Sequence, residues 1–191
     1  MKPLHPFLID LARFLPVATG AQLLRHYFAG NVAAFRAALR AAQAKGYIEL
    51  STQLGRPWSH TGKPLASFQA GERVLSAEQI AYQASQRWSD SPVPMLIVRG
   101  TASLAMLCGG TPRTIASGHL SHELAIAEVF LTKRLHEPTF EWSLVHARPG
   151  AGVLPDAIAG TLACEILGRY SGASVQAKLT LEGRFNLLEL W

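Results

Sequence analysis

The segment TGAQLLRHYFAGNVAAFRAALRAAQAKG, residues 19–46, predicts two short helices joined by a tight turn. Thr19 is a favourable N-cap residue, and Gln22 three positions later completes the capping-box pattern that marks the start of a helix. Asn31 caps the second helix. Gly46 ends it, because glycine readily adopts the left-handed backbone conformation found just past a helix end.

The second of these helices has two distinct faces. One carries the apolar residues of a buried stripe, Phe35, Leu39 and Ala42. A neighbouring face carries polar residues that recur four and then three positions apart, Arg36, Arg40 and Gln43, with Lys45 at the helix end. Arg and Gln can make bidentate contacts with guanine and adenine edges, so a helix-turn-helix that reads DNA is one interpretation. An ordinary amphipathic helix with a solvated face is the other.

The sequence that follows predicts a β-hairpin. YIELSTQLG (47–55) and LASFQAG (65–71) are prone to form strands, and the segment between them is rich in turn-forming residues. Arg56 and Lys63 would lie in or beside the hairpin tip, where they could reach phosphates. A strand, a basic tip and a second strand after a helix-turn-helix form the layout of a winged helix. We therefore expect a winged helix-turn-helix DNA-binding domain over residues 1–90.

The distribution of charge supports this interpretation. The formal net charge is +5, and residues 1–90 contain ten Lys/Arg against five Asp/Glu, whereas residues 91–191 contain eight of each. A positive field confined to one part of a protein favours a polyanion at that surface. Double-stranded DNA is the expected partner. Winged helices also dock proteins, so a protein-interaction module is an alternative.

Residues 72–88 predict a further helix that either closes the winged domain or mediates a homodimer. SDSPVP (89–94) is a plausible domain boundary, because proline and serine interrupt both helices and strands. We therefore expect a second domain over residues 91–191.

The order of elements in this second domain is helix, three strands, helix, strand. The segments are 117–138 (helix), 140–150, 154–160 and 161–170 (strands), 171–182 (helix) and 185–191 (strand). This α-β-β-β-α-β order is that of the PD-(D/E)XK nuclease core. The fold class predicted for the whole chain is therefore α+β, a winged helix-turn-helix followed by a small nuclease-like domain.

The nuclease motif looks incomplete. Pro155-Asp156 opens the second of these strands and Glu165 lies in the third. In such nucleases an Asp and a Glu on adjacent strands bind Mg²⁺, and a Lys two residues after the Glu helps to position the attacking water. Leu167 stands at that Lys position here, and Lys178 or Arg169 would have to replace it. We expect no catalytic residues and no cofactor; if the domain does cleave DNA, Asp156 and Glu165 would bind Mg²⁺, assisted by Lys178.

Glutamates and histidines near residue 120 offer other sites. Glu123 and Glu128 could add a carboxylate to the Asp156 and Glu165 pair. His119, His122 and Glu123 suggest a zinc helix, but the HExxH pattern would need a histidine where Ile126 stands. We therefore interpret His119 to His122 as the start of a helix.

Three segments carry a resemblance to a known family: HLSHELAIAEVFL (119–131), PDAI (155–158) and ACEILGRYS (163–171). On these segments the chain resembles the plasmid replication-relaxation family. The resemblance implies a winged helix joined to a degenerate PD-(D/E)XK-like domain. It also implies a role in replication control, mobilisation or transcription of a plasmid or other mobile element. The departure at Leu167 argues against retained cleavage.

The remaining features indicate a cytoplasmic protein without membrane contact. No run of about 18 apolar residues appears. Asp10 and Arg13 interrupt the apolar opening segment, which we interpret as a helix rather than a signal peptide. The two cysteines, Cys108 and Cys164, lack the spacing of a zinc site.

Overall fold

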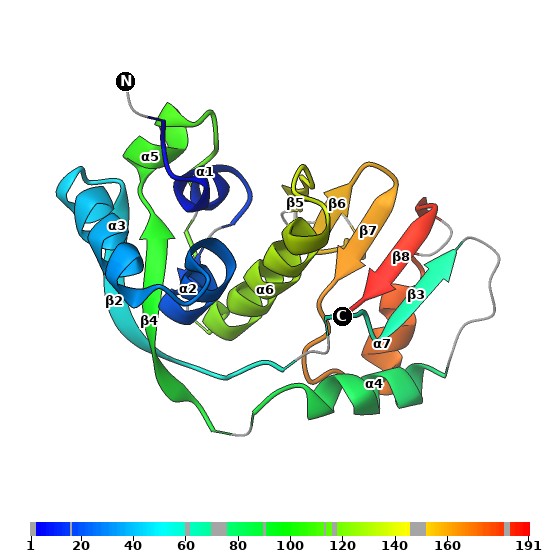
Figure 1. Ribbon diagram of the computed structural model, residues 1–191. Helices are drawn as coiled ribbons and strands as arrows, with labels where there is room; N and C mark the ends of the chain where they lie inside the picture. Colours follow the sequence, from blue (N-terminus) through cyan, green and yellow to red (C-terminus); the bar gives the residue numbers. More distant parts are fainter. Residues whose placement is uncertain are drawn as a thin grey trace. The chain divides into compact units, whose positions relative to one another are not determined.

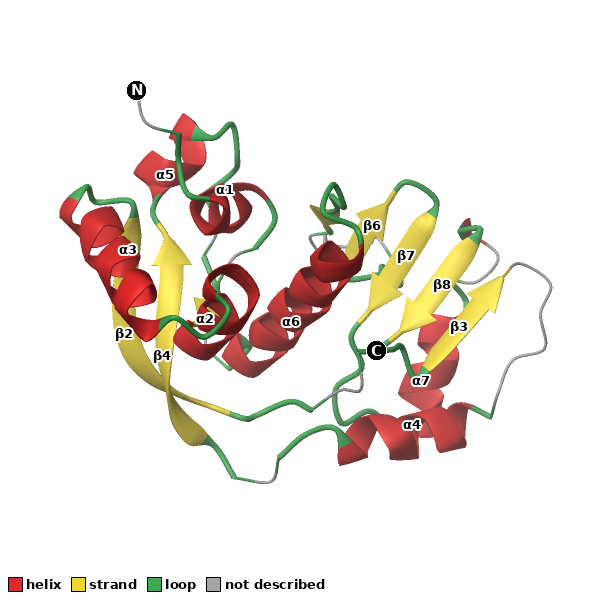
Figure 2. Cartoon of the chain, viewed as in Figure 1, coloured by secondary structure: helices red, strands yellow, loops and turns green. Residues whose placement is uncertain are grey.

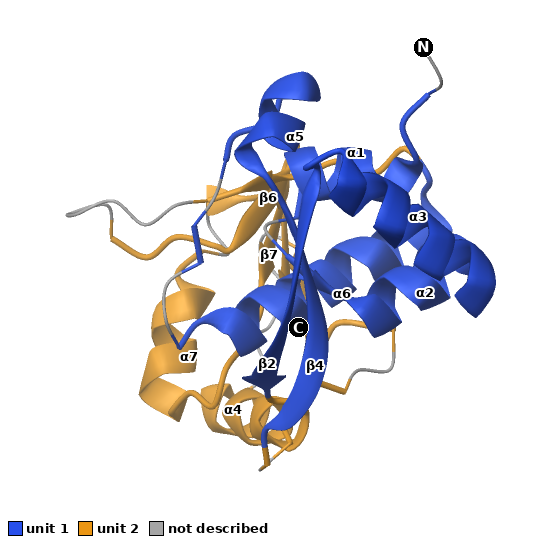
Figure 3. Cartoon of the chain, turned by 90° about the vertical axis from the view of Figure 1, so that its left-hand side faces the viewer, with its two compact units in different colours: residues 1–55, 92–138 blue, residues 56–91, 139–191 orange. Residues whose placement is uncertain are grey.

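The computed structural model describes residues 3–15, 17–59, 62–69, 76–89, 91–112, 114–115, 118–145, 152–181 and 184–191. The chain is α+β, as predicted, with helices and two β-sheets (Figures 1 and 2). It divides into two compact units, shown in different colours in Figure 3. Unit 1 contains Met1–Gly55 and Pro92–Pro138, and unit 2 contains Arg56–Ser91 and Thr139–Trp191.

The units differ from the contiguous domains expected at 1–90 and 91–191, because each is built from two separate segments. Strand pairing between distant parts of the chain is the physical reason. A strand before residue 56 pairs with a strand after residue 92, and a strand near residue 67 pairs with one near residue 188.

Unit 1 begins with three helices, α1 (Pro6–Arg13), α2 (Gly20–Phe28) and α3 (Val32–Ala44). The predicted capping box is present: Thr19 Oγ1 accepts the Gln22 N–H at 3.0 Å, and Gln22 Oε1 accepts the Thr19 N–H at 2.8 Å. Asn31 Oδ1 accepts the Ala34 N–H at 3.0 Å and so caps α3. The expected helix starts and the turn between α2 and α3 are therefore confirmed.

The sheet of unit 1 has the order β1-β4-β2, with both pairings antiparallel. Its strands are β1 (Ala18–Thr19), β2 (Ile48–Gly55) and β4 (Val93–Gly100). β2 and β4 are paired along their whole length, from Ile48 opposite Gly100 to Gly55 opposite Val93. The strand expected over 47–55 is confirmed.

The hairpin predicted over 47–71 is wrong. Its second strand exists as β3 (Ala66–Gln69), but β3 pairs with β8 (Leu187–Leu190) in unit 2. The inward side chains of β3, Ala66 and Phe68, belong to the core of unit 2. β4 instead offers β2 an eight-residue partner that contributes fully buried side chains to unit 1.

Unit 1 is completed by α5 (Ala102–Leu107) and α6 (Leu120–His136). The helix expected over 117–138 is thus present, but it belongs to unit 1. It is joined to α2 by a hydrogen bond from Gln22 Nε2 to the Leu124 carbonyl at 2.8 Å. α6 spans 17 residues, and no helix in the described part of the chain is long and apolar enough to cross a membrane.

Unit 2 contains a five-stranded sheet of order β3-β8-β7-β6-β5. The remaining strands are β5 (Ser143–Leu144), β6 (Ala157–Ala159) and β7 (Leu162–Glu165). β5, β6 and β7 are antiparallel neighbours, whereas β7 and β8 are parallel and are connected through α7 (Gly172–Leu179). The order of three strands, a helix and a strand that is expected after residue 139 is confirmed, but each of the three strands before the helix is shorter than expected. Residues 146–150 of that expected strand lie outside the described residues.

The helix expected over 72–88 is α4 (Ala77–Gln86), and residues 70–75 lie outside the described residues. Its buried residues pack with α7 in the core of unit 2; they are Ala77, Ile80, Ala81 and Ala84. The interpretation that this helix closes the winged domain is therefore wrong.

Two short segments of unit 2, around Trp58 and Trp88, run antiparallel to each other; the first follows β2 and the second precedes β4. Ser59 N–H donates to the Arg87 carbonyl at 2.8 Å, and Ser89 N–H donates to the Pro57 carbonyl at 2.9 Å. The rings of Trp58 and Trp88 lie 6.2 Å apart between these bonds. The chain thus enters and leaves this part of unit 2 at one place.

Thr19→Ala should lower the free energy of unfolding by about 1–2 kcal/mol, because it leaves the Gln22 N–H without its acceptor in a buried position. The measurement is urea denaturation followed by far-ultraviolet circular dichroism. Thr111→Ala, at an exposed loop position of unit 1, is the matched control and should change stability by less than about 0.5 kcal/mol. Equal effects of the two substitutions would contradict a stabilising capping box.

Candidate functional site

The exposed face of α3 is the first candidate site. Phe35, Leu39 and Ala42 are buried, as the periodicity predicted. The predicted DNA-contacting residues of this helix are exposed: Arg36, Arg40, Gln43 and Lys45. Arg36, Arg40 and Gln43 share one side of the helix, because positions four and seven residues apart lie close to the same face.

Helix α3 is held in place by aromatic packing and by the helix before it. The rings of Phe28 and Phe35 meet edge to face at 5.4 Å. On α2, Arg25 Nη2 lies 2.5 Å from Glu128 Oε1 of α6, and His26 Nε2 lies 3.4 Å from the same oxygen. Glu128, a candidate further carboxylate beside Asp156 and Glu165, instead forms this ion pair in unit 1.

The positive charge belongs to the same unit as α3. Unit 1 contains ten Lys/Arg and five Asp/Glu, a net charge of +5, whereas unit 2 contains eight of each. The excess predicted for the first ninety residues therefore resides in the unit that carries the exposed Arg and Gln side chains.

Arg56 and Lys63 lie in unit 2 instead of at a hairpin tip. Arg56 Nη1 donates to the Ser89 carbonyl at 3.2 Å, and the Lys63 carbonyl accepts from Arg87 Nη2 at 3.1 Å. Their placement on a wing is wrong because the hairpin that would have carried them does not form.

A cluster of charged side chains in unit 2 is the second candidate site. Asp156 directly precedes β6, and its N–H donates to the Cys164 carbonyl of β7 at 3.0 Å; extending the register of the two strands by one residue places Asp156 opposite Glu165. Asp156 Oδ2 accepts the Ile166 N–H at 2.8 Å. Lys178 of α7 lies with Nζ 2.7 Å from Glu165 Oε1, and it donates to the Leu154 carbonyl at 3.1 Å. The structure therefore brings together the three residues named for a nuclease site.

Tyr170 lies close to this cluster. Burial, together with the Glu165 and Asp156 carboxylates, raises the pKa of Tyr170 to about 12. The phenol therefore stays protonated at neutral pH, and it lacks the activation that a tyrosine nucleophile needs.

The cluster does not fit a Mg²⁺ ion. Glu165 is fully buried and already faces the Lys178 ammonium group, and Leu167, at the motif lysine position, is also fully buried. Arg169, the other possible replacement, donates to the Trp88 carbonyl at 3.1 Å. The described residues contain no group of three or more His, Cys, Asp or Glu side chains that could hold a metal ion. We derive no metal-dependent step from this arrangement.

The sequence did not reveal a buried ionic cluster in unit 1. Asp10 of α1 is 4% exposed, and its Oδ1 lies 2.8 Å from Arg134 Nη2 of α6. Tyr27 of α2 donates its hydroxyl to Asp10 Oδ2. The sequence feature that points to this cluster is Asp10, an acidic residue that interrupts the apolar opening segment. Its partners are distant in sequence. His119, by contrast, directly precedes α6, as expected of a helix start.

No protein-family model, curated protein or solved structure matched this chain.

Lys178→Met should lower the free energy of unfolding by about 3 kcal/mol, because it leaves the Glu165 carboxylate buried without its cation. All four tryptophans lie in unit 2, so urea denaturation followed by tryptophan fluorescence reports on this unit.

The double variant Glu165→Leu/Lys178→Met supplies the matched comparison. It should recover most of the lost stability, since replacing both members of a buried ion pair with apolar residues is often close to neutral. If the stability lost in the double variant equals the sum of the losses in Glu165→Leu and Lys178→Met, the two side chains have no interaction free energy.

Proposed function

We propose that this protein binds double-stranded DNA through unit 1, with α3 as the recognition helix of a winged helix-turn-helix. The observation that carries the proposal is the exposed row of Arg36, Arg40 and Gln43 on the face of α3 next to its buried stripe. These side chains have the donors and acceptors that distinguish guanine and adenine in the major groove.

The arrangement of elements supports the proposal. α2 and α3 are joined by a short turn and followed by β2, which pairs with β4 as an antiparallel ribbon. A helix-turn-helix followed by such a ribbon is the layout of a winged helix. Here residues 56–92 stand between the two ribbon strands, in the place of a simple wing tip.

Electrostatics also support it. The net charge of +5 in unit 1 favours association with a phosphate backbone, and every phosphate that is neutralised releases bound counterions. Binding should therefore weaken steeply as salt is raised. Lys45, exposed at the end of α3, is a candidate phosphate contact.

The biological role we propose is that of a regulator or accessory factor in replication, mobilisation or transcription of a plasmid or other mobile element. This part rests on the resemblance of three segments to the plasmid replication-relaxation family. In that family a winged helix is joined to a degenerate PD-(D/E)XK-like domain, and the β5-β6-β7-α7-β8 order of unit 2 is compatible with such a core. A cytoplasmic homodimer that reads an inverted repeat fits this role.

A DNA endonuclease is the second candidate function. The meeting of Asp156, Glu165 and Lys178 favours it. The Lys178–Glu165 ion pair and the apolar Leu167 weigh against it, for the reasons given above. It predicts Mg²⁺-dependent cleavage that is lost in Asp156→Ala and Glu165→Ala.

Arg36→Ala and Arg40→Ala should each reduce affinity for the preferred DNA by about 1–3 kcal/mol and weaken sequence preference. The target is first selected from a random duplex library, and affinity is then measured across a salt series. Arg36→Lys and Arg40→Lys retain the charge but lose the bidentate geometry, so they should lose preference while keeping most of the affinity for unrelated DNA. Arg184→Ala, which removes an exposed arginine from unit 2, is the control and should bind normally.

Unchanged DNA binding in the α3 variants would refute α3 as the recognition helix. If the unmodified protein has no salt-sensitive affinity for DNA, the protein-interaction alternative is favoured. Cleavage that requires Mg²⁺ and disappears in Asp156→Ala would establish the nuclease instead.

A further inference from the structure

A pocket of about 370 Å³ lies within unit 1 between α1, α2 and α6. Its apolar walls include Ile9 of α1 and Leu131 and Leu135 of α6. Leu135 is 67% exposed and lies at the rim, whereas Leu131 is fully buried. A mainly apolar pocket of a few hundred Å³ with a small number of polar groups is typical of small-molecule sites.

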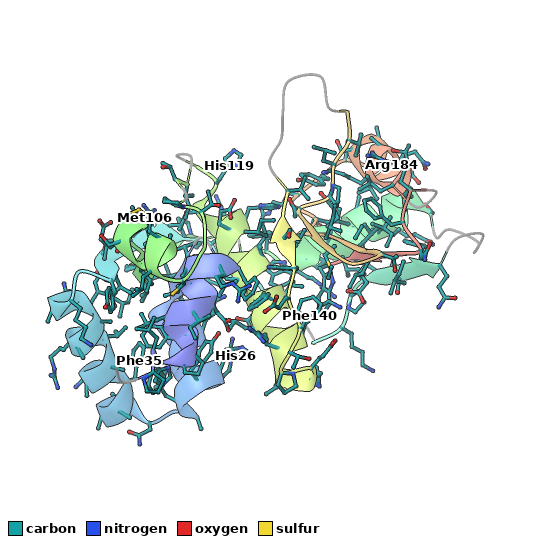
Figure 4. All side chains as sticks on the ribbon, turned by 90° about the horizontal axis from the view of Figure 1, so that it is seen from above. His26, Phe35, Met106, His119, Phe140 and Arg184 are labelled. Carbon is teal, nitrogen blue, oxygen red and sulfur yellow. The ribbon has the colours of Figure 1, made fainter. Side chains whose placement is uncertain are left out.

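The polar part of the lining is the buried ionic cluster. It consists of Asp10, Arg134 and Tyr27, and His26 is a further polar residue of the lining. Asp10 pairs with Arg134 at 2.8 Å and accepts the hydroxyl of Tyr27. Burial and the neighbouring Asp10 carboxylate raise the pKa of Tyr27 well above its usual range, so the phenol remains neutral. The His26 side chain is 9% exposed and lines the pocket, and its Nε2 lies 3.4 Å from Glu128 Oε1 of α6. Figure 4 labels His26 beside α6.

The charges of the lining define the chemistry of the ligand. Asp10 and Arg134 compensate each other, so the lining contributes no net charge for an ionic ligand to neutralise. An anion would compete with Asp10 for Arg134, and a cation would compete with Arg134 for Asp10. Either would leave one partner of a largely buried pair uncompensated, which is costly. A neutral ligand avoids this cost.

We propose that this pocket binds a small neutral molecule with an apolar body and one hydrogen-bonding group, and that its occupancy changes the affinity for DNA. The apolar body would lie against Ile9, Leu131 and Leu135, with the polar group toward Tyr27 and His26. The effect on DNA rests on the proposed function. It follows because α2 supplies both His26 and Tyr27, and because Phe28 of α2 packs on Phe35 of α3.

Binding is tested by isothermal titration calorimetry of the full chain with three probes of similar shape: 4-propylphenol, 4-propylbenzoate and 4-propylbenzylammonium. The neutral phenol should bind at least about tenfold more tightly than either ion. Leu135→Trp places an indole at the rim and should abolish binding. Met106→Trp, at a 71% exposed position of α5 in the same unit (Figure 4), should bind as the unmodified protein does.

The exposure of Leu135 and Met106 makes both variants compatible with folding, which circular dichroism verifies. The absence of binding by all three probes, or equal binding by the Leu135→Trp variant, overturns the site. So does tighter binding of either ion than of the phenol.

The coupling is measured by titrating DNA with and without saturating 4-propylphenol. The dissociation constant for DNA should change by about fivefold or more in the unmodified protein and remain constant in Leu135→Trp. Binding of the probe with unchanged DNA affinity overturns the coupling. If the protein binds no DNA even without the probe, the proposed function fails, while calorimetry still decides whether the site exists.

Discussion

The pairing of β2 with β4 is the interaction on which the rest of the structure depends. The two strands align over eight residues although residues 56–92 separate them along the chain. This ladder builds the sheet of unit 1, which α2 and α3 contact, and it makes residues 56–91 an insertion that contributes to unit 2. A backbone N–H or C=O group that is buried without a hydrogen-bond partner costs free energy. The β2–β4 pairing avoids this cost, and it thereby determines which segments of the chain belong to each unit.

Within this framework, α3 combines two roles that its sequence separates cleanly. Its apolar stripe attaches it to unit 1, and its Arg and Gln side chains remain available to a partner. The ion pairs of Glu128 and Asp10 tie α1 and α2 to α6. The recognition helix that we propose would need such fixed support, because base contacts discriminate only when their donors and acceptors are correctly placed. In the cluster of Asp156, Glu165 and Lys178, by contrast, the Lys178 ammonium group already compensates the charge of the Glu165 carboxylate.

Local features could be predicted from the sequence, and long-range pairings could not. Thr19, Gln22 and Asn31 cap helices through hydrogen bonds to residues three positions away, so a short sequence window contains the whole interaction. The strand expected over 65–71 is present as β3 (Ala66–Gln69), but nothing in its own residues distinguishes β2 from β8 as a partner. For the sites, the sequence correctly indicated the two faces of α3 and the proximity of Asp156 to Glu165. The sequence did not determine whether Lys178 lies near these two carboxylates. It also indicated no partner for Asp10, which pairs with Arg134, 124 positions away.

The discontinuity of both units has a consequence for the order in which the protein can fold during synthesis. Unit 1 needs α6, and unit 2 needs β8, the partner of both β3 and β7. When residues 1–90 have been made, β2 and β3 both lack their partners and present unpaired strand edges, which favour association with other chains. During synthesis, the sheet of unit 1 cannot be completed before β4 has been made, and the sheet of unit 2 cannot be completed before β8 has been made.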